Sequence, residues 1–171
     1  MISLFLLATA VAGMSEIDVG ANSRAGMQLC SNPDAATKTC SAIASYAVAG
    51  DGSFVETTEV LIAADKPITL QMSVPVQVEG GSICGQMTEG GLEGAMVRVG
   101  GVPLPADRNS AALNSLMPQL KPLVGRKTCD GLRVEDGRLM KYGQVDRIDV
   151  NLPGKPVAWV SVGSGYRVAP R

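Results

Sequence analysis

Residues Ile68-Thr-Leu-Gln-Met-Ser-Val-Pro-Val-Gln-Val-Glu79 carry the clearest structural signal in the chain, because every even position is apolar and nearly every odd position is polar. A period of two over this length is typical of a β-strand with one buried and one solvated face. Pro75 lies on the polar face and has no backbone N–H, which predicts a sheet edge or a bulge at this residue. The segment therefore predicts a sheet whose apolar face needs a cover.

Further strand signals lie on both sides of this segment. Residues 41–49 and 53–63 flank Gly50-Asp51-Gly52, whose glycines permit the positive φ angles of a hairpin turn. Together with 68–79 they predict a meander of three antiparallel strands. The last third of the chain predicts four more strands around two turn sequences, over residues 132–134, 138–142, 145–152 and 157–162.

The middle of the chain predicts one helix, over residues 105–124. Its apolar residues recur at helical spacing, Pro105 suits a first turn, and Gly125 is a typical C-terminal stop. Pro118 lies inside the pattern and predicts a kink or an early break just before it. We expect the apolar stripe of this helix to cover the even-numbered face of 68–78.

These elements together predict an α+β fold class. We expect an antiparallel sheet of about five to seven strands packed against one main helix, residues 105–124, with two disulfides. Hydrophobic residues make up 46% of the chain and aromatic residues only 4%, so small aliphatic side chains must form most of the core. The order of the strands does not follow from the sequence.

The N-terminal residues 1–12 are typical of an export signal. They are apolar from Leu4 onward, and Ala10-Val11-Ala12 offers a small-x-small cleavage site. The segment is short and has no basic residue near its start, so it is an atypical signal, and an apolar strand or tail is the alternative. We expect residues 13–25 to be a linker and 26–171 to be a single globular domain. No segment of the mature chain approaches the roughly 18 apolar residues that a membrane helix needs.

Four cysteines follow the leader: Cys30, Cys40, Cys84 and Cys129. An even number of cysteines after an export segment predicts a disulfide framework. Of the three possible pairings, we favour Cys30 with Cys40 and Cys84 with Cys129. A zinc site needs closely spaced ligand pairs and usually histidine, and the sequence has neither. We therefore expect no metal and no cofactor.

The charge of the chain is balanced, with 15 basic and 16 acidic residues. Nucleic-acid binding depends on clustered Lys and Arg, so no nucleic-acid partner is expected. The densest basic group is Lys121, Arg126 and Lys127, at the end of the predicted helix. Cations complement the helix dipole at that position, which accounts for them without a ligand.

The chain contains no histidine. Ser-His-Asp and Cys-His catalysis and zinc hydrolysis by a paired-histidine motif are therefore excluded. Carboxylate pairs remain as candidates, but each is expected on a turn or on a polar strand face, where solvated carboxylates are ordinary. The pairs are Glu56 with Glu59, Glu135 with Asp136, and Asp146 with Asp149. We predict no catalytic residue.

Three sequence strings resemble a known group of proteins. They are Cys30 to Tyr46 (CSNPDAATKTCSAIASY), Ile83-Cys84-Gly85 and the closing Gly165-Tyr-Arg-Val-Ala-Pro170. They are similar to an uncharacterised family of small exported proteins of Gram-negative bacteria, and the similarity covers most of the mature chain. The family carries no assigned activity, so the resemblance implies export and paired cysteines and contributes no site residues.

The leading functional hypothesis is a periplasmic or secreted, non-enzymatic domain. It would bind a partner protein or a cell-envelope component, through an exposed strand edge near Pro75 or through the loop 32–38. The alternative hypothesis is an envelope hydrolase that uses a carboxylate pair. A deep pocket with convergent acids would favour the hydrolase, and a flat surface with an open sheet edge would favour the binding domain.

Overall fold

The computed structural model of the chain describes residues 18–146, 148–149 and 153–170. The expected leader, residues 1–12, lies outside the described residues. The helices are α1 (Val19–Arg24), α2 (Glu89–Glu93) and α3 (Ala106–Leu120), followed by the 3-10 helix η1 (Lys121–Leu123). The strands are β1 (Met27–Ser31), β2 (Thr39–Cys40), β3 (Ala42–Val48), β4 (Phe54–Leu61), β5 (Ile68–Glu79), β6 (Ser82–Gln86), β7 (Met96–Val99), β8 (Val102–Pro103), β9 (Lys127–Glu135), β10 (Arg138–Val145), β11 (Ile148–Asp149), β12 (Lys155–Ser161) and β13 (Arg167–Val168).

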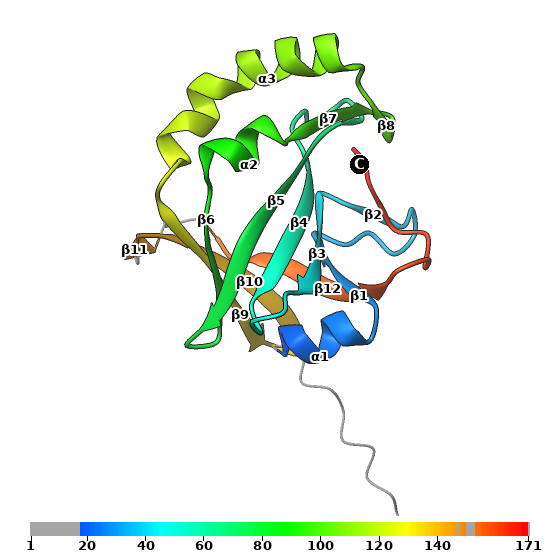
Figure 1. The fold of residues 1–171 in the computed structure, drawn as a ribbon. Helices are drawn as coiled ribbons and strands as arrows, with labels where there is room; N and C mark the ends of the chain where they lie inside the picture. Colours follow the sequence, from blue (N-terminus) through cyan, green and yellow to red (C-terminus); the bar gives the residue numbers. More distant parts are fainter. Residues whose placement is uncertain (1–17, 147, 150–152, 171) are drawn as a thin grey trace, which may run out of the picture.

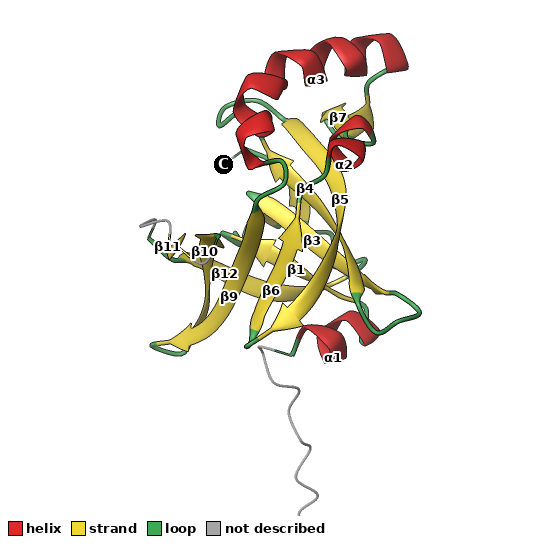
Figure 2. Ribbon diagram, turned by 60° about the vertical axis from the view of Figure 1, so that its left-hand side comes forward, coloured by secondary structure: helices red, strands yellow, loops and turns green. Residues whose placement is uncertain are grey.

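Eight antiparallel strands of the described chain close into a barrel (Figures 1 and 2). Neighbouring strands follow the order β4-β3-β1-β12-β10-β9-β6-β5, and β5 pairs again with β4. Since the ladder returns to the strand at which it began, this ring of strands has no terminal member. The strands beyond the ring are short and lie at its margins, with β7 and β8 on β5 and β11 on β10.

The predicted fold class is wrong, although most of the predicted strands are present. The molecule is mostly a closed antiparallel barrel with short helices, and not an α+β sheet packed against one main helix. The predicted hairpin around Gly50-Asp51-Gly52 corresponds to β3 and β4, which pair along their full length. The physical reason for the error is that a barrel covers its inward apolar face with its own opposite wall, so no helix is needed there.

Strand β5 changes partner along its length. Residues 68–71 pair with β7, and residues 76–79 pair with β6, while β4 runs along the other side. Residues 72–75 lie between the two ladders and have a strand partner only in β4. Pro75 falls in this gap, where one side of the strand makes no ladder. The sheet edge expected at Pro75 is therefore only a short interruption in the barrel wall.

A cap, defined here as residues 87–126, is inserted between β6 and β9 and contains α2, β7, β8 and α3. The two barrel strands lie side by side, with Cys84 opposite Cys129, and the disulfide between these residues joins them. At the neck of the cap, the Gly125 N–H donates to the Met87 carbonyl at 2.9 Å. Figure 2 shows α2 and α3 at the end of the barrel opposite α1.

Helix α3 packs against the upper part of β5 and against β7. Asn109 anchors it, because its side chain accepts from the Val97 N–H at 2.7 Å and donates to the Ala95 carbonyl at 3.0 Å. No residue of α3 is itself buried. The apolar contact consists of buried sheet residues and half-buried helix residues, among them Leu70, Ala95, Val97, Leu113, Leu116 and Leu120.

The predicted helix is thus correct in position but only partly correct in its role. It covers the even-numbered face of β5 near Ile68 and Met72, whereas Val74 and Val76 on the same face belong to the barrel. The α-helix runs through Pro118 to Leu120 and then tightens into η1, so it ends later than the proline predicted.

Helix α1 closes the other end of the barrel. Its Val19 is 3% exposed and lies in the barrel core, and Asp18 caps the helix by accepting from the Ala21 N–H at 2.8 Å. The segment 13–25, expected to be a linker, therefore contributes a helix to the domain. The helix has only six residues, too few for a helical period to be seen in the sequence. The remaining core residues come from the barrel strands: Leu29, Ala44, Tyr46, Val76, Ile83, Leu132, Leu139 and Val157.

Both disulfides join the cysteines favoured from the sequence, Cys30 with Cys40 and Cys84 with Cys129. The first lies outside the barrel, where Cys30 and Cys40 form a small buried cluster with Val160. Strand β13 pairs in parallel with β2 over this cluster. Among the described residues, no helix combines the length and apolar character needed to cross a bilayer.

Candidate functional site

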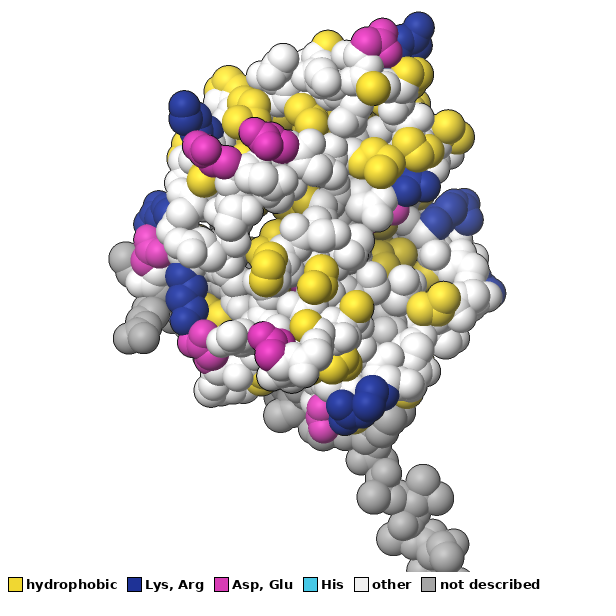
Figure 3. All heavy atoms as spheres, viewed as in Figure 1, with side chains coloured by type: hydrophobic (Ala, Val, Ile, Leu, Met, Phe, Trp, Pro, Cys, Tyr) yellow, Lys and Arg dark blue, Asp and Glu magenta, His cyan; other side chains and the backbone are white. Residues whose placement is uncertain are grey.

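A cavity of about 180 Å³ lies inside the barrel, between β4, β5, β6 and β9. It occupies the half of the barrel nearer to the cap. Most of its wall is apolar, and its polar groups come from β4 and β9. The lining residues are Met72, Val74, Val76, Ile83, Gly85 and Met87, together with Glu56, Thr58, Thr128 and Asp130. Figure 3 shows a hollow on the face of the molecule seen in Figure 1, with hydrophobic side chains around it.

The pairing of β3, β4 and β5 places Glu56 inside the barrel. Glu56 lies opposite Tyr46 on one side and opposite Val74 on the other, and directly opposed residues share a face of the sheet. Tyr46 is 7% exposed and belongs to the barrel core, so Glu56 faces inward as well. The sequence prediction of a solvated carboxylate is therefore wrong for Glu56.

Glu59, the proposed partner of Glu56, lies on the opposite face of β4. It accepts a hydrogen bond from the Thr69 hydroxyl at 2.6 Å and lines a groove outside the barrel. Successive residues of a strand alternate between the two faces, so a spacing of three cannot bring two side chains together. The structure thus separates the first predicted carboxylate pair.

The carboxyl group of Glu56 has a hydrogen bond but no ion-pair partner among the described residues. It accepts from the Thr58 hydroxyl at 2.6 Å, and none of the ion pairs in the described part of the chain includes it. Burial raises the pKa of Glu56 above its ordinary value, and the nearby charge of Asp130 adds to this rise. The hydrogen bond from Thr58 and the charge of Lys141 oppose it. Glu56 is thus an inward-facing acid that is costly to ionise.

Asp130 and Lys141 form the other polar element of the barrel interior. Asp130 lies on β9 and lines the cavity, while Lys141 lies on the neighbouring strand β10. The Lys141 Nζ is 2.9 Å from Asp130 Oδ2, and the two side chains are 21% and 33% exposed. The interior therefore carries two carboxyl groups and one ammonium group, an excess of one negative charge when both acids are ionised.

Tyr46 supports this polar group from β3. Its ring packs against Trp159, with ring centroids 6.0 Å apart, in a tilted arrangement. Burial raises the pKa of the Tyr46 phenol well above its ordinary value, and the charges of Glu56 and Asp130 raise it further. The phenol is therefore neutral wherever the domain is folded near neutral pH, and it adds no charge to the cavity.

The described members of the other two predicted carboxylate pairs line none of the cavities of the described structure. Glu135 accepts from the Tyr142 hydroxyl at 2.5 Å, and Asp136 occupies the turn between β9 and β10 with φ of 50°. Asp146 forms an exposed ion pair with Arg126 at 2.7 Å, whose hydrogen bond lowers the pKa of Asp146. The side chain of Asp149 lies outside the described part of the structure.

The structure instead brings together Glu56 and Asp130, a combination that the sequence does not suggest. On β4, the inward face contains Phe54, Glu56 and Thr58, and the outward face contains Val55, Thr57 and Glu59. The two faces have the same composition of apolar, hydroxyl and acidic residues, so the alternation cannot show which glutamate is internal. Only the apolar neighbours of Asp130 on β9, Leu132 above all, hint that its face is buried.

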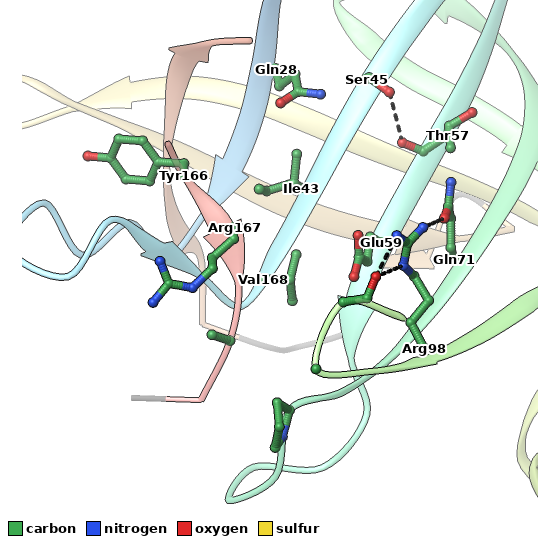
Figure 4. A pocket seen from close by; sticks show the side chains of 14 residues that line it. Gln28, Ile43, Ser45, Thr57, Glu59, Gln71, Arg98, Tyr166, Arg167 and Val168 are labelled. Carbon is green, nitrogen blue, oxygen red and sulfur yellow. Dashed lines mark hydrogen bonds between the residues drawn. The ribbon is translucent and has the colours of Figure 1, made fainter. Parts of the chain in front are cut away.

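A second concavity, of about 450 Å³, lies outside the barrel between β13 and the strands β3, β4 and β5 (Figure 4). Two of its charged groups, Glu59 and Arg98, already have hydrogen-bond partners in the protein. The Arg98 guanidinium donates to Gln71 Oε1 at 2.8 Å and to the Gly101 carbonyl at 2.7 Å. Figure 4 shows Arg98 and Gln71 facing each other, whereas Tyr166 and Arg167 project away from them. The polar groups that meet in this open groove, Glu59, Gln71 and Arg98, are therefore bonded to the protein itself.

No family model, no curated protein and no solved structure matches the chain. Function is therefore inferred from the cavity and its chemistry.

Proposed function

We propose that the protein is an exported, non-enzymatic binding protein, periplasmic or secreted, whose barrel holds one small molecule. The carrying observation is the convergence of Glu56, Asp130 and Lys141 on a cavity with apolar walls. Eight-stranded barrels have interiors wide enough for a single small ligand, and small-molecule sites usually combine apolar walls with a few polar groups. The two disulfides support an oxidising compartment.

The size of the cavity limits the ligand. A volume of about 180 Å³ accommodates roughly six to ten non-hydrogen atoms, on the scale of about 30 Å³ per liquid water molecule. Sites for drug-sized ligands are larger, at roughly 300–1,000 Å³. The ligand is therefore a small metabolite or headgroup fragment and not a lipid chain or a peptide.

The case for binding a protein or an envelope component on the outer surface is weaker. The edge near Pro75 is limited to residues 72–75, and the loop 32–38 is held at its base by the Cys30–Cys40 disulfide. The charges on the face in Figure 3 are mixed in sign and not gathered into one patch. Pro75 borders an open concavity of about 500 Å³, but Lys127 and Glu79 in its wall already pair with each other, so the internal cavity is the better binding site.

A hydrolase is the second candidate, because two acids do meet in one cavity. A buried carboxyl with a raised pKa is suited to act as a general acid, and Glu56 meets that description. However, glycoside hydrolysis needs two carboxyl groups on opposite sides of a bond, with sugar bound on each side. A cavity of about 180 Å³ has no room for two sugars, and Lys141 holds Asp130 in an ion pair. Binding without turnover therefore fits the geometry better.

The test is a fragment screen followed by methyl NMR. We expect a bound fragment to shift the methyl signals of Val74, Ile83 and Met87, and to leave those of exposed Val134 unchanged. Val74→Phe should fill the cavity and abolish the shifts, whereas Val55→Phe, on the outer face of β4, should not. A ligand that shifts only surface methyls, or that binds Val74→Phe normally, would contradict the proposal. Turnover of the bound fragment in the same samples would favour the hydrolase.

A further inference from the structure

Building on the proposed function, we infer that the ligand is a small organic cation, an amine or methylated ammonium compound, whose charge is held by Glu56. The inference rests on the arrangement of charged groups around the cavity and on the chemistry of its walls. It concerns the ligand class only, so it can fail while the cavity remains a binding site.

The interior charges are unequally paired. Asp130 is neutralised by the Lys141 ammonium at 2.9 Å, but among the described residues the carboxyl group of Glu56 is bonded only to a hydroxyl, that of Thr58. Elsewhere around the cavity, β5 and β6 contribute Val74, Ile83 and other groups that do not titrate, and β3 contributes the neutral Tyr46. One negative charge in the barrel thus has no cation of its own.

This imbalance selects the sign of the ligand charge. An anion would be repelled by two carboxyl groups and attracted by a single ammonium group, that of Lys141, which Asp130 already neutralises. A cation would give Glu56 the partner that Asp130 already has, and a charge-assisted hydrogen bond is roughly twice as strong as a neutral one. A neutral ligand would leave the charge of Glu56 uncompensated.

The apolar wall requires that the cation be organic. Carbon and thioether groups of Met72, Val74, Val76, Ile83 and Met87 surround most of the space. The described part of the chain has no group of three side chains that could hold a metal ion. A hydrated metal ion would gain nothing from the aliphatic wall, whereas the alkyl groups of an amine would bury apolar surface against it.

The same arrangement makes binding sensitive to acid. A cation binds the ionised form of Glu56, so protonation of this carboxyl competes with the ligand. Because burial raises the pKa of Glu56, the loss on acidification should begin at a higher pH than for an exposed carboxylate. Lys141 and Asp130, which form an ion pair, face Glu56 from β10 and β9, and Tyr46 faces it from β3.

The experiment compares three probes with the same branched alkyl chain: 3-methylbutylamine, which is cationic, 3-methylbutanol and 3-methylbutanoate. Affinity is measured by NMR titration of the Val74 and Ile83 methyl groups at pH 7.5. We expect the amine to bind at least about tenfold more tightly than the alcohol, and the carboxylate to bind most weakly. Lowering the pH should weaken amine binding and leave alcohol binding unchanged.

Glu56→Gln and Glu59→Gln form a matched pair of variants. The two glutamates lie on one strand, each accepts from a threonine hydroxyl at 2.6 Å, and they face opposite sides of the wall. We expect Glu56→Gln to lose about tenfold in amine affinity and to keep its alcohol affinity, while Glu59→Gln keeps both. If Glu56→Gln failed to fold, the wild-type contrast between amine and alcohol and its pH dependence would decide.

Two outcomes distinguish failure of the cationic ligand class from failure of the proposed binding cavity. Equal binding of amine and alcohol, unchanged in Glu56→Gln, would overturn the cationic class and leave the binding cavity standing. A screen in which no fragment shifts the cavity methyl groups would overturn both. Tighter binding of the carboxylate than of the amine would contradict the assigned charge directly.

Discussion

The barrel and the cap share strand β5 and bury its apolar face to a similar depth, since Leu70 beneath α3 is 2% exposed, but they cover it with different elements. In the barrel, Val76 is 4% exposed and Ile83 3%, because the opposite wall closes over them. In the cap, α3 lies on Leu70 without burying any residue of its own. One alternating stripe therefore serves two layers. The difference lies in the cover: inside the ring the covering residues are themselves buried, whereas the residues of α3 are half-buried at most and should contribute less to stability.

Of the changes that distinguish the cap from the barrel, removal of the disulfide at the neck of the cap should lower the free energy of unfolding most. The Cys84–Cys129 bridge closes a separation of 45 residues, and its loss should lower the free energy of unfolding by about 4 kcal/mol through the entropy of the unfolded chain. The double variant Cys84→Ala/Cys129→Ala would be measured by urea denaturation. Cys30→Ala/Cys40→Ala, with a separation of 10, should lose about 2.7 kcal/mol. A larger loss from the shorter loop would contradict this ranking.

Truncation of a barrel core residue should cause the second largest loss in the free energy of unfolding. Leu29 is 1% exposed, so Leu29→Ala should cost about 3 kcal/mol through lost burial and the cavity that remains. Leu116→Ala in the half-buried face of α3 should cost about 1 kcal/mol, because less apolar area leaves water. Equilibrium denaturation of both variants gives the two values. Equal losses would mean that the cap is as tightly packed as the barrel.

Removal of the Asn109 side chain, which anchors α3, tests whether the cap and the barrel unfold independently. Asn109→Ala removes both hydrogen bonds between the helix and β7, at Val97 and Ala95, and should cost about 1–2 kcal/mol. The measurement is hydrogen exchange. We expect faster exchange at amides of the cap and unchanged exchange in β9 and β10. Uniform acceleration across the barrel would show that the cap and the barrel unfold as one unit.

Glu56→Gln should have the smallest effect, and it should be visible as a pH dependence. The folded-state pKa of Glu56 is raised, so the folded chain binds its proton more tightly than the unfolded chain. The contribution to stability is therefore greatest in acid and falls as pH rises from the ordinary value of 4.5 towards the folded-state pKa. Glu56→Gln should remove this fall and be slightly more stable than the wild type near neutral pH. Urea denaturation at several pH values, with Glu59→Gln as the control, measures it.

Local features of the fold could be predicted from the sequence. The alternation in 68–79 identifies β5, the glycines around Asp51 identify the β3–β4 hairpin, and the spacing of apolar residues places α3 within a few residues. The preferred cysteine pairs are also present. Apart from the Cys84–Cys129 pair, each of these signals depends on neighbours in the sequence.

Closure of the barrel could not be predicted in this way. It depends on pairings between distant segments, such as β1 with β12, and an alternating strand looks the same in an open sheet and in a ring. Strand β1 shows no alternation, because Leu29 faces the core while Cys30 is buried on the outside against Cys40. The site depends on the same distant pairings, since Glu56 and Asp130 meet only across the closed interior.

The neck beneath the cap has a consequence for how this protein can change. Gln86 lies opposite Lys127 in the ladder, so a tight turn between them would complete an ordinary hairpin without altering any rung below. The residues between those two positions are the cap, and the Cys84–Cys129 disulfide joins the two strands from which it projects. Insertions or deletions there can change the length of the cap without shifting the pairing of β6 with β9 below it.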